Sequence, residues 1–401
     1  MQTNLSTEFK ATEEGKTVDR ILRSCVHCGF CTATCPTYQV LGNELDSPRG
    51  RIYLIKQMFE KNEVSQATLQ HLDRCLTCRS CETTCPSGVE YHTLLDIGKQ
   101  HAIRTVKRPL AGKLFRKAIV STLENPKRFK ILYQIGQQFR LLLPPSIKKN
   151  IRPKSMPKIW PDQNHSRKVI LFEGCVQPTL TPEVNDTIAN LLNKLEIQVI
   201  RLPEMGCCGA MHHHTDAPDL ALQRIKANID AWWPQINRVE AIITSASGCG
   251  VFIKDYEQLL SGEPEYLDKA KLLEEKQKDI AELLADEDLS TINSPYQGKT
   301  IRFHPPCTLQ HGQKINGVVE KILGKLNLTV TLPEDSHLCC GSAGTYSILQ
   351  KTLSTALKER KTNALMSNDP DLIVTANIGC QLQLQSSCTI PVKHWVELLS
   401  D

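Results

Sequence analysis

The sequence predicts an α+β protein in which an N-terminal helical domain precedes two small α/β lobes with parallel sheets. Three observations support this fold class: two cysteine runs of identical spacing, helical periodicity between them, and a C-terminal part that repeats its own strand and cysteine pattern. A chain of 401 residues is long enough for two or three domains. We expect a helical domain at 1–100, a basic segment at 101–167, and lobes at 168–297 and 298–401.

The helical domain contains the same cysteine pattern twice. Each run reads C-x2-C-x2-C-x3-C-P, and the second follows the first at an offset of 50 positions. In the bacterial ferredoxin pattern, each run gives three thiolates to one [4Fe–4S] cluster and its fourth cysteine to the other cluster. We therefore expect two [4Fe–4S] clusters. The predicted ligands are Cys25, Cys28, Cys31 and Cys85 for the first cluster, and Cys35, Cys75, Cys78 and Cys81 for the second.

Zinc sites and disulfides explain these runs less well. A zinc site needs only paired C-x2-C motifs, and it leaves the third cysteine and the Cys-Pro of each run without a role. Disulfides belong to oxidising compartments. Residues 1–19 are polar and show no apolar leader, so we expect a reducing compartment. The sequence has no run of 18 apolar residues, so no membrane span is expected.

A helical insert separates the two runs. Ser47 is a suitable N-cap and Pro48 fits the first helical position. Apolar residues then recur at helical spacing, at Ile52, Ile55, Met58 and Phe59. Further helices are expected at 64–74 and 94–106. This insert is too long for a compact ferredoxin, and it resembles the helical ferredoxin module of respiratory electron-transfer subunits.

Residues 101–168 are strongly basic, with 17 Lys and Arg against two acids. The whole chain carries only +5, so the remainder is about −10 by subtraction. We expect helices at 115–123 and 129–143, followed by a Pro-containing linker at 151–168. One hypothesis is that this segment docks on an acidic partner subunit or an anionic membrane surface; a solvated linker is the alternative. Nucleic acid is not expected as a partner, because no recognised binding motif accompanies the charge.

From Lys168 onward the chain repeats itself. KVILFEGC, MGCCGA and AIITSASGC recur as TIRFHPPC, HLCCGS and LIVTANIGC at offsets of 131 or 132 positions. Such self-similarity indicates a duplicated lobe. Strand-like runs alternate with helical stretches, which predicts a parallel sheet in each lobe. Residues 252–288 are expected to be a helical insertion of the first lobe without a counterpart in the second.

The cysteines of each lobe follow predicted strands, so they meet at one edge of the sheet. They are Cys175, Cys207, Cys208 and Cys249 in the first lobe, and Cys307, Cys339, Cys340 and Cys380 in the second. The pattern resembles the cysteine-rich CCG domain of heterodisulfide reductase, in which five cysteines per lobe hold a cluster. Here Ala246 and Asn377 replace the fifth cysteine. Four thiolates suit an additional cluster, a Zn site or a reduced thiol site. Cys388 and the triplet His212–His214 are predicted to serve packing or face solvent.

Several longer stretches carry a wider resemblance. CVHCGFCTATCPTY, SPRGRIYLIKQ, HLDRCLTCRSCETTCPSGVEYH, CTLQHGQKINGVVEK, DSHLCCGSAGTYS and IVTANIGCQ resemble a family of respiratory iron–sulfur subunits, that of glycolate oxidase (glycolate dehydrogenase). The resemblance implies a complex with two flavin-type subunits that carry FAD. It implies oxidation of glycolate, and of D-lactate, to glyoxylate and pyruvate, with electrons passed to quinone or another membrane acceptor. It places the chain on the cytoplasmic side, peripheral to the bacterial inner membrane. One departure is Pro305, where relatives often carry another cysteine.

On this interpretation the chain is the electron-transfer subunit of an oxidoreductase and carries no catalytic residue for the substrate. Consistent with this, the sequence has no dinucleotide fingerprint, P-loop or nucleophile elbow. The alternatives are an iron–sulfur subunit of another flavin dehydrogenase, for glycerol 3-phosphate or lactate, a thiol redox enzyme like heterodisulfide reductase, and a non-catalytic redox sensor.

Overall fold

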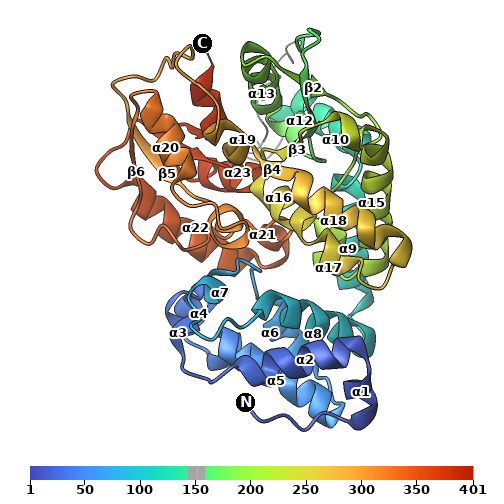
Figure 1. Cartoon of the computed structure of the whole chain (residues 1–401). Helices are drawn as coiled ribbons and strands as arrows, with labels where there is room; N and C mark the ends of the chain where they lie inside the picture. The colour runs from blue at the N-terminus through green and yellow to red at the C-terminus, as the bar shows by residue number, and fades with distance from the viewer. Residues whose placement is uncertain (143–150, 152–158, 401) are drawn as a thin grey trace. The chain divides into compact units, whose positions relative to one another are not determined.

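The computed structural model of the chain describes residues 1–142, 151 and 159–400 (Figure 1). The chain divides into two compact units. The first comprises Met1–Phe115 and His337–Lys361, and the second comprises Arg116–Ser336 and Thr362–Asp401. A segment that the sequence places within the second lobe therefore belongs to the same unit as the N-terminal helices.

The first unit is built from helices. In chain order they are α1 (Thr7–Ala11), α2 (Glu13–Ser24), α3 (Phe30–Ala33), α4 (Pro36–Leu41), η1 (Glu44–Asp46), α5 (Pro48–Lys61), α6 (Gln66–Asp73), α7 (Ser80–Thr83) and α8 (Tyr91–Thr105), with α21 (Tyr346–Leu349) and the larger part of α22 (Lys351–Met366) from the later segment. The helix predicted between the cysteine runs is confirmed as α5. Its N-cap is also confirmed, because Ser47 Oγ accepts the Gly50 N–H at 3.0 Å.

The core of the first unit positions the cysteine runs. Apolar faces of α2, α5, α6 and α8 meet in one cluster that includes Leu22, Ile55 and Leu94, all fully buried. Burial of each such side chain stabilises the fold by about 1.5–3 kcal/mol. Helix α2 ends at Ser24, directly before the first run, and α6 ends at Asp73, just before the second. Each cysteine run is therefore fixed at its N-terminal end by a helix that is packed in the core.

The second unit contains two parallel four-stranded sheets, as predicted. Their strand orders are β2-β1-β3-β4 and β6-β5-β7-β8. Strands β1 and β3 pair with Val169 opposite Ala241, and β5 and β7 pair with Ile301 opposite Leu372. The first sheet consists of β1 (Arg167–Phe172), β2 (Ile197–Ile200), β3 (Ala241–Thr244) and β4 (Gln277–Asp279). The second consists of β5 (Thr300–His304), β6 (Thr329–Thr331), β7 (Leu372–Thr375) and β8 (Val392–His394).

Helices connect these strands in both lobes (Figure 1). The first lobe has α12 (Gln177–Leu180), α13 (Pro182–Lys194), α14 (Ala210–His214), α15 (Pro218–Trp232), η3 (Trp233–Arg238), α16 (Ser247–Lys254), α17 (Tyr256–Leu259), α18 (Pro264–Lys276) and α19 (Ile280–Ala285). The second has η4 (Thr308–Gly312), α20 (Val318–Lys325), α22 (Lys351–Met366), α23 (Ile378–Gln385) and η5 (Trp395–Leu399). One apolar cluster of the second unit draws on both sheets, with Val169 and Ile243 from one lobe and Phe303 and Val374 from the other.

The prediction that residues 252–288 have no counterpart in the second lobe is wrong for the C-terminal part of this segment. Helices α17 and α18 are extra, but the chain then forms the edge strand β4 and helix α19. These correspond to β8 and η5, and the motif K-x-x-x-E-L-L occurs at Lys278–Leu284 and again at Lys393–Leu399. The short, polar strand β4 gave no apolar run by which the sequence could reveal it.

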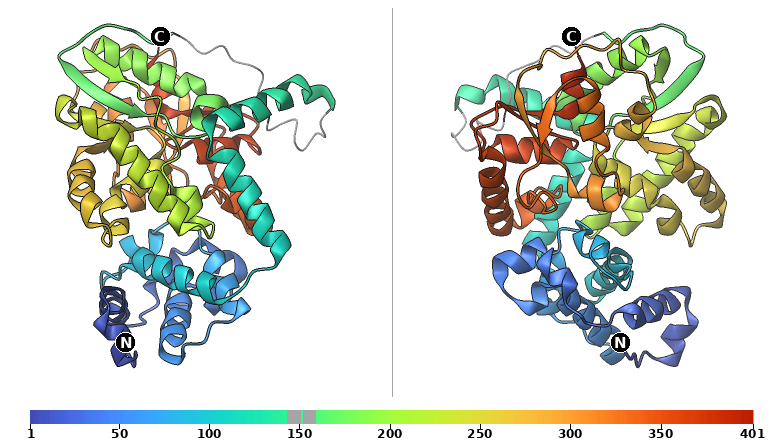
Figure 2. Two further views of the ribbon diagram at one scale, coloured as in Figure 1. Left: turned by 90° about the vertical axis from the view of Figure 1, so that its right-hand side faces the viewer. Right: turned by 60° about the vertical axis from the view of Figure 1, so that its left-hand side comes forward.

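The basic segment forms the two expected helices, α9 (Leu110–Leu123) and α10 (Pro126–Gln138), followed by η2 (Arg140–Leu142). The linker predicted at 151–168 lies partly outside the described residues. In the left view of Figure 2, α10 extends away from the sheets of its unit. Among the described residues, no helix combines the length and apolarity that a membrane crossing requires.

Candidate metal centres

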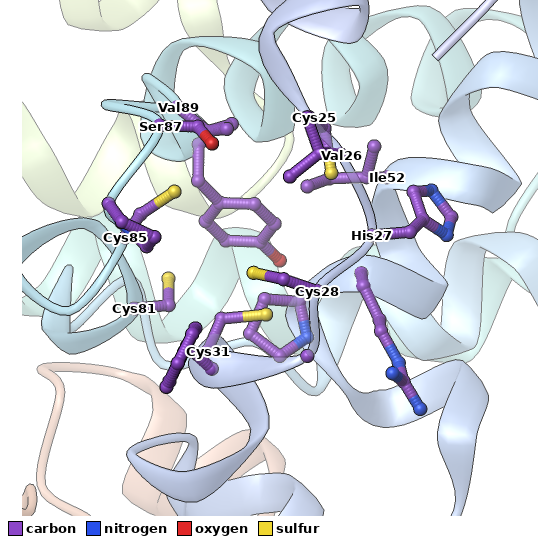
Figure 3. Close-up of a pocket in the computed structure, with 16 residues that line it drawn as sticks. Cys25, Val26, His27, Cys28, Cys31, Ile52, Cys81, Cys85, Ser87 and Val89 are labelled. Atoms are coloured by element: carbon purple, nitrogen blue, oxygen red, sulfur yellow. The ribbon is translucent and has the colours of Figure 1, made fainter.

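The first predicted set of cysteines surrounds one cavity (Figure 3). Cys25, Cys28, Cys31 and Cys85 all line it, and their sulfur atoms point toward its interior. Cys81 also borders this cavity. Cys28 is exposed, whereas Cys25 is buried and Cys31 is partly buried. The structure thus brings together, from both runs, the four cysteines that the spacing assigns to the first cluster.

The loops that carry these sulfurs have matching, unusual backbones. His27 and Gly29 have φ values of 56° and 89°, and the equivalent Thr77 and Arg79 have 51° and 59°. A positive φ is unfavourable for Thr in particular, because its side chain branches at Cβ. Such strain persists where the surroundings fix it, often around ligand sites. Both loops therefore hold their cysteines in the same backbone conformation, which the intrinsic φ preferences of these residues alone do not favour.

The second predicted set also converges. Burial raises the pKa of the Cys81 thiol well above its ordinary value, and the neighbouring thiols Cys78, Cys75 and Cys35 raise it further. The Tyr91 hydroxyl donates a hydrogen bond to Cys75 Sγ at 3.6 Å. None of the 17 cysteines, all of which lie in the described part of the chain, forms a disulfide.

The donor sets match the chemistry of iron–sulfur clusters. Four sulfur donors from close-spaced cysteines suit such clusters, and hydrogen bonds to sulfur and burial tune them. Without metal, burial raises the pKa of the Cys31 thiol to about 11, with smaller contributions from neighbouring thiols. Iron binds thiolates, so loading these sites releases protons.

A buried charged group beside the second set was not foreseen from the sequence. Asp46 lies at its centre, with His71 Nδ1 at 2.9 Å, Arg74 Nη1 at 3.0 Å and Arg51 Nη2 at 3.5 Å from its carboxylate oxygens. Asp46 is fully buried and Arg51 is 1% exposed. The signal available in the sequence was Arg51 itself, a charged residue placed among the apolar positions of a predicted core helix.

The four cysteines of the first lobe form a separate cluster in the second unit. Hydrogen bonds from Cys175 and Cys208 lower the pKa of Cys207, which also accepts the Gly209 N–H at 3.4 Å. The pKa of Cys208 is raised by its hydrogen bonds to Cys207 and Cys249 and by burial. The predicted meeting of these cysteines beyond the strands is therefore observed, with Cys207 favoured as the thiolate.

The cysteines of the second lobe fall in different units. Cys307 and Cys380 follow β5 and β7 in the second unit, whereas Cys339 and Cys340 belong to the segment that groups with the first. Cys339 Sγ accepts the Gly341 N–H at 3.4 Å, as its counterpart does in the first lobe. Asn377, at the position of the absent fifth cysteine, donates to Cys380 Sγ at 3.5 Å and accepts the Gly248 N–H at 3.2 Å. It therefore joins the two lobes.

The remaining candidates are explained by packing. His212 is buried against Glu124 at 2.6 Å, and His213 is buried with its ring against Phe252. Both agree with the packing role predicted for the triplet. Cys388 is also buried, and burial raises the pKa of its thiol.

Comparisons with known proteins agree with this arrangement. The model of a cysteine-rich domain, CCG, matches residues 169–254 and 301–385, and that of a 4Fe-4S dicluster domain matches residues 21–89. The chain is 50% identical over 401 residues to the glycolate oxidase iron-sulfur subunit of Escherichia coli (strain K12), covering 100% of this chain and 98% of that protein. The chain belongs to the family of glycolate oxidase iron–sulfur subunits.

Other members and structures extend the comparison. A probable glycolate oxidase iron-sulfur subunit of Bacillus subtilis (strain 168) is 30% identical, covering 95% of this chain and 91% of its own. A hypothetical protein from Helicobacter pylori shares the fold, with a TM-score of 0.56 and 11% identity over 98% of this chain and 72% of that one. As a family member, the chain is an iron–sulfur component of an oxidoreductase complex, which confirms the resemblance seen in the sequence.

Proposed function

We propose that this chain relays electrons during the oxidation of glycolate, from a flavin subunit to a respiratory acceptor. The observation that carries the proposal is the pair of cysteine sets in the first unit, where residues of both runs converge on one cavity. Iron–sulfur clusters supply one-electron steps, whereas a flavin accepts the two electrons of an alcohol oxidation. The two cysteine sets equip this chain to pass electrons from the flavin to the acceptor one at a time.

The proposed ligands are Cys25, Cys28, Cys31 and Cys85 for one [4Fe–4S] cluster. Those for the other are Cys35, Cys75, Cys78 and Cys81. Cys81, a proposed ligand of the second cluster, also lines the cavity surrounded by the first set, which supports two neighbouring sites. The exposed Cys28, flanked by Val26 at 67% and Phe30 at 61% exposure, marks the first set as the one nearer to solvent. We assign electron entry to this side.

The proposed reaction removes two electrons and two protons from glycolate to give glyoxylate, and D-lactate gives pyruvate in the same way. The chain passes the electrons singly, and a quinone takes up two electrons and two protons. Two FAD-carrying subunits are the proposed partners. The names of the Escherichia coli and Bacillus subtilis relatives support glycolate; an iron–sulfur subunit for glycerol 3-phosphate or L-lactate oxidation is the second candidate.

The test is glycolate-driven reduction in the whole complex. The chain is co-expressed with its flavin subunits, purified anaerobically and mixed with glycolate while the cluster signals are followed by EPR. Reduction by glycolate supports the proposal. Reduction by glycerol 3-phosphate or L-lactate, with glycolate leaving the signals unchanged, would assign the chain to the second candidate.

The lobe cysteines are proposed as a further metal or thiol site. In the first lobe, the contacts among Cys175, Cys207, Cys208 and Cys249 support the binding of one metal ion or cluster by all four thiols. Cys307, Cys339, Cys340 and Cys380 are the equivalent candidates in the second lobe. Iron content after anaerobic reconstitution separates the possibilities, because two ferredoxin clusters account for about eight iron atoms. A content that stays at eight, with zinc also absent, leaves these cysteines as thiols.

Helix α10 is proposed to bind an anionic membrane surface. Residues 125–142 include four basic residues and no acid. Ile131, Leu132, Ile135 and Phe139 lie at helical spacing along one face and are 48–59% exposed. An exposed apolar stripe combined with basic residues is typical of helices that lie in a membrane interface. The basic charge favours anionic lipid over a neutral surface.

Vesicle binding tests this location. The chain should sediment with phosphatidylglycerol vesicles more than with phosphatidylcholine vesicles, and less as salt is raised. Ile135→Gln with Phe139→Gln should weaken binding about tenfold or more. Leu220→Gln, at another exposed leucine of the same unit (46%), serves as the control and should bind normally. Normal vesicle binding by the double variant would contradict the membrane proposal. Binding of α10 to the flavin subunits without binding to vesicles would contradict it as well.

A further inference from the structure

The two cysteine sets of the first unit lie in different electrostatic surroundings. Beside the second set, Arg51 and Arg74 share the carboxylate of Asp46. Two guanidinium groups against one carboxylate leave one positive charge in excess. Arg51 is 1% exposed and its side chain is also held by the His71 carbonyl at 2.8 Å. This charge is therefore fixed in the interior rather than solvated.

The charge is connected to the cysteine sulfurs. Arg51 Nη2 donates to Thr37 Oγ1 at 3.2 Å, and Thr37 Oγ1 lies 3.3 Å from Cys35 Sγ. Burial works against the charged form of Arg51, but the neighbouring Tyr91, Cys75, Cys35 and Asp46 hold its pKa above the ordinary value. Arg74 directly precedes Cys75, and its carbonyl accepts a hydrogen bond from the Tyr346 hydroxyl at 3.1 Å.

Among the described residues, no buried arginine lies beside the first set; a cation there is the partly buried α-ammonium group of Met1, which donates to the Cys25 carbonyl at 2.7 Å. Apolar side chains such as Val26, Ile52 and Val89 line its cavity. The arginine that borders this cavity, Arg49, forms an ion pair with Glu44, and both side chains are 35–46% exposed. Solvent therefore screens this pair, and its opposite charges cancel.

We propose that Arg51 and Arg74 are positioning residues that raise the reduction potential of the cluster held by Cys35, Cys75, Cys78 and Cys81. Reduction adds one negative charge to a cluster, and a buried cation stabilises that charge more strongly than a solvated one. Raising the potential of the second set favours electron flow toward it from the first set. This inference rests on the proposed assignment of ligands to two clusters.

The test measures potentials in chains that hold one cluster each. Cys28→Ser with Cys85→Ser leaves only the second set intact, and Cys35→Ser with Cys78→Ser leaves only the first. Each background is reconstituted anaerobically with and without Arg51→Gln, and the cluster is titrated by EPR at controlled potential. In the second-set background, Arg51→Gln should lower the equilibrium constant for reduction at least tenfold, which is 59 mV for one electron. In the first-set background it should have no comparable effect.

Two further variants keep the test decisive. Arg49→Gln removes a partly exposed cation two residues away and should leave the potential of the second set unchanged. Arg74→Gln removes the other cation of the network. The Arg74 side chain is 24% exposed, so this variant disturbs the core less, and it replaces Arg51→Gln as the test if the Arg51→Gln protein does not retain iron. An iron-loaded variant of either arginine with an unchanged potential would overturn the inference, as would an equal shift in both backgrounds. Failure of the second-set background to hold iron would instead refute the ligand assignment.

Discussion

Asp279 and His394 occupy equivalent positions in the two lobes, each as the N-cap of the helix after the fourth strand. Both are fully buried. Burial raises the pKa of Asp279 to about 7, and burial lowers the pKa of His394 to about 4. His394 Nδ1 accepts the Val396 N–H at 3.3 Å while Nε2 donates to the Ser245 carbonyl at 2.9 Å, so the neutral ring with its proton on Nε2 is the form that fits. The two residues thus set opposite pH limits on the same unit.

Asp279 should lower the stability of the second unit as pH rises from about 4 to 7, and His394 should offset this fall below about pH 6.5. Asp279 has a folded pKa above its ordinary 3.8, so its contribution is present below that value and is lost as pH rises toward 7. Each pH unit between the two values costs up to about 1.4 kcal/mol. Asp279→Asn keeps a capping side chain and should remove most of this slope. Urea unfolding followed by tryptophan fluorescence is the measurement, because Trp160, Trp232, Trp233 and Trp395 all lie in this unit.

Asp288→Asn is the matched control: Asp288 is exposed, so this substitution should leave the pH dependence of stability between about pH 4 and 7 unchanged. His394 acts in the opposite direction. Its depressed pKa means that its contribution is present above the ordinary value of 6.5 and is lost as pH falls toward 4. An Asp279→Asn protein with the wild-type slope would show that Asp279 is not the group responsible.

At the scale of the element, the Cys-Cys-Gly turns depend on their glycines. Gly209 has a φ of 101°, and a Cβ there would lie 3.2 Å from the Ala221 carbonyl oxygen and 3.2 Å from the Phe252 ring. The turn thus packs directly onto α15 and α16. This close approach places the lobe cysteines next to the ends of the strands.

Gly209→Ala should destabilise the second unit by roughly 2–3 kcal/mol, because it combines an unfavourable φ with a tight contact. Gly298→Ala is the control: Gly298 also has a positive φ, 76°, but a Cβ there meets nothing within 4 Å. It should cost roughly 1 kcal/mol. Urea unfolding of the two proteins gives the comparison, and equal losses would mean that backbone strain alone matters.

Elements with a strong pattern were predictable from the sequence. Helix α5 had both a cap and apolar periodicity, and the strands that precede cysteines were short, mostly apolar runs repeated in each lobe. Strand β4 was missed because three residues, Gln277–Asp279, carry no apolar pattern. The Asp46 network was missed because its members come from three separate segments, and only folding brings their charges together.

For the whole molecule, spacing predicted which cysteines converge, but it could not predict how the chain divides. The repeat places Cys339 and Cys340 with the second lobe, yet residues 337–361 group with the helical unit. Contacts of Tyr346 with the Arg74 carbonyl, and of Arg360 with Gln39 at 2.5 Å, hold the segment there. These contacts join residues far apart in sequence, so no local pattern records them.

We propose that the two cysteine runs interleave their ligands, so that each run supplies the fourth cysteine of the other's cluster. Double variants test it through iron content and EPR after anaerobic reconstitution. Cys28→Ser with Cys85→Ser should affect one cluster and remove about four iron atoms, whereas Cys28→Ser with Cys35→Ser should affect both clusters and remove about eight. The reverse result, in which the Cys28 and Cys35 variant loses one cluster and the Cys28 and Cys85 variant loses two, would show that each run holds its own cluster and would contradict the interleaved assignment.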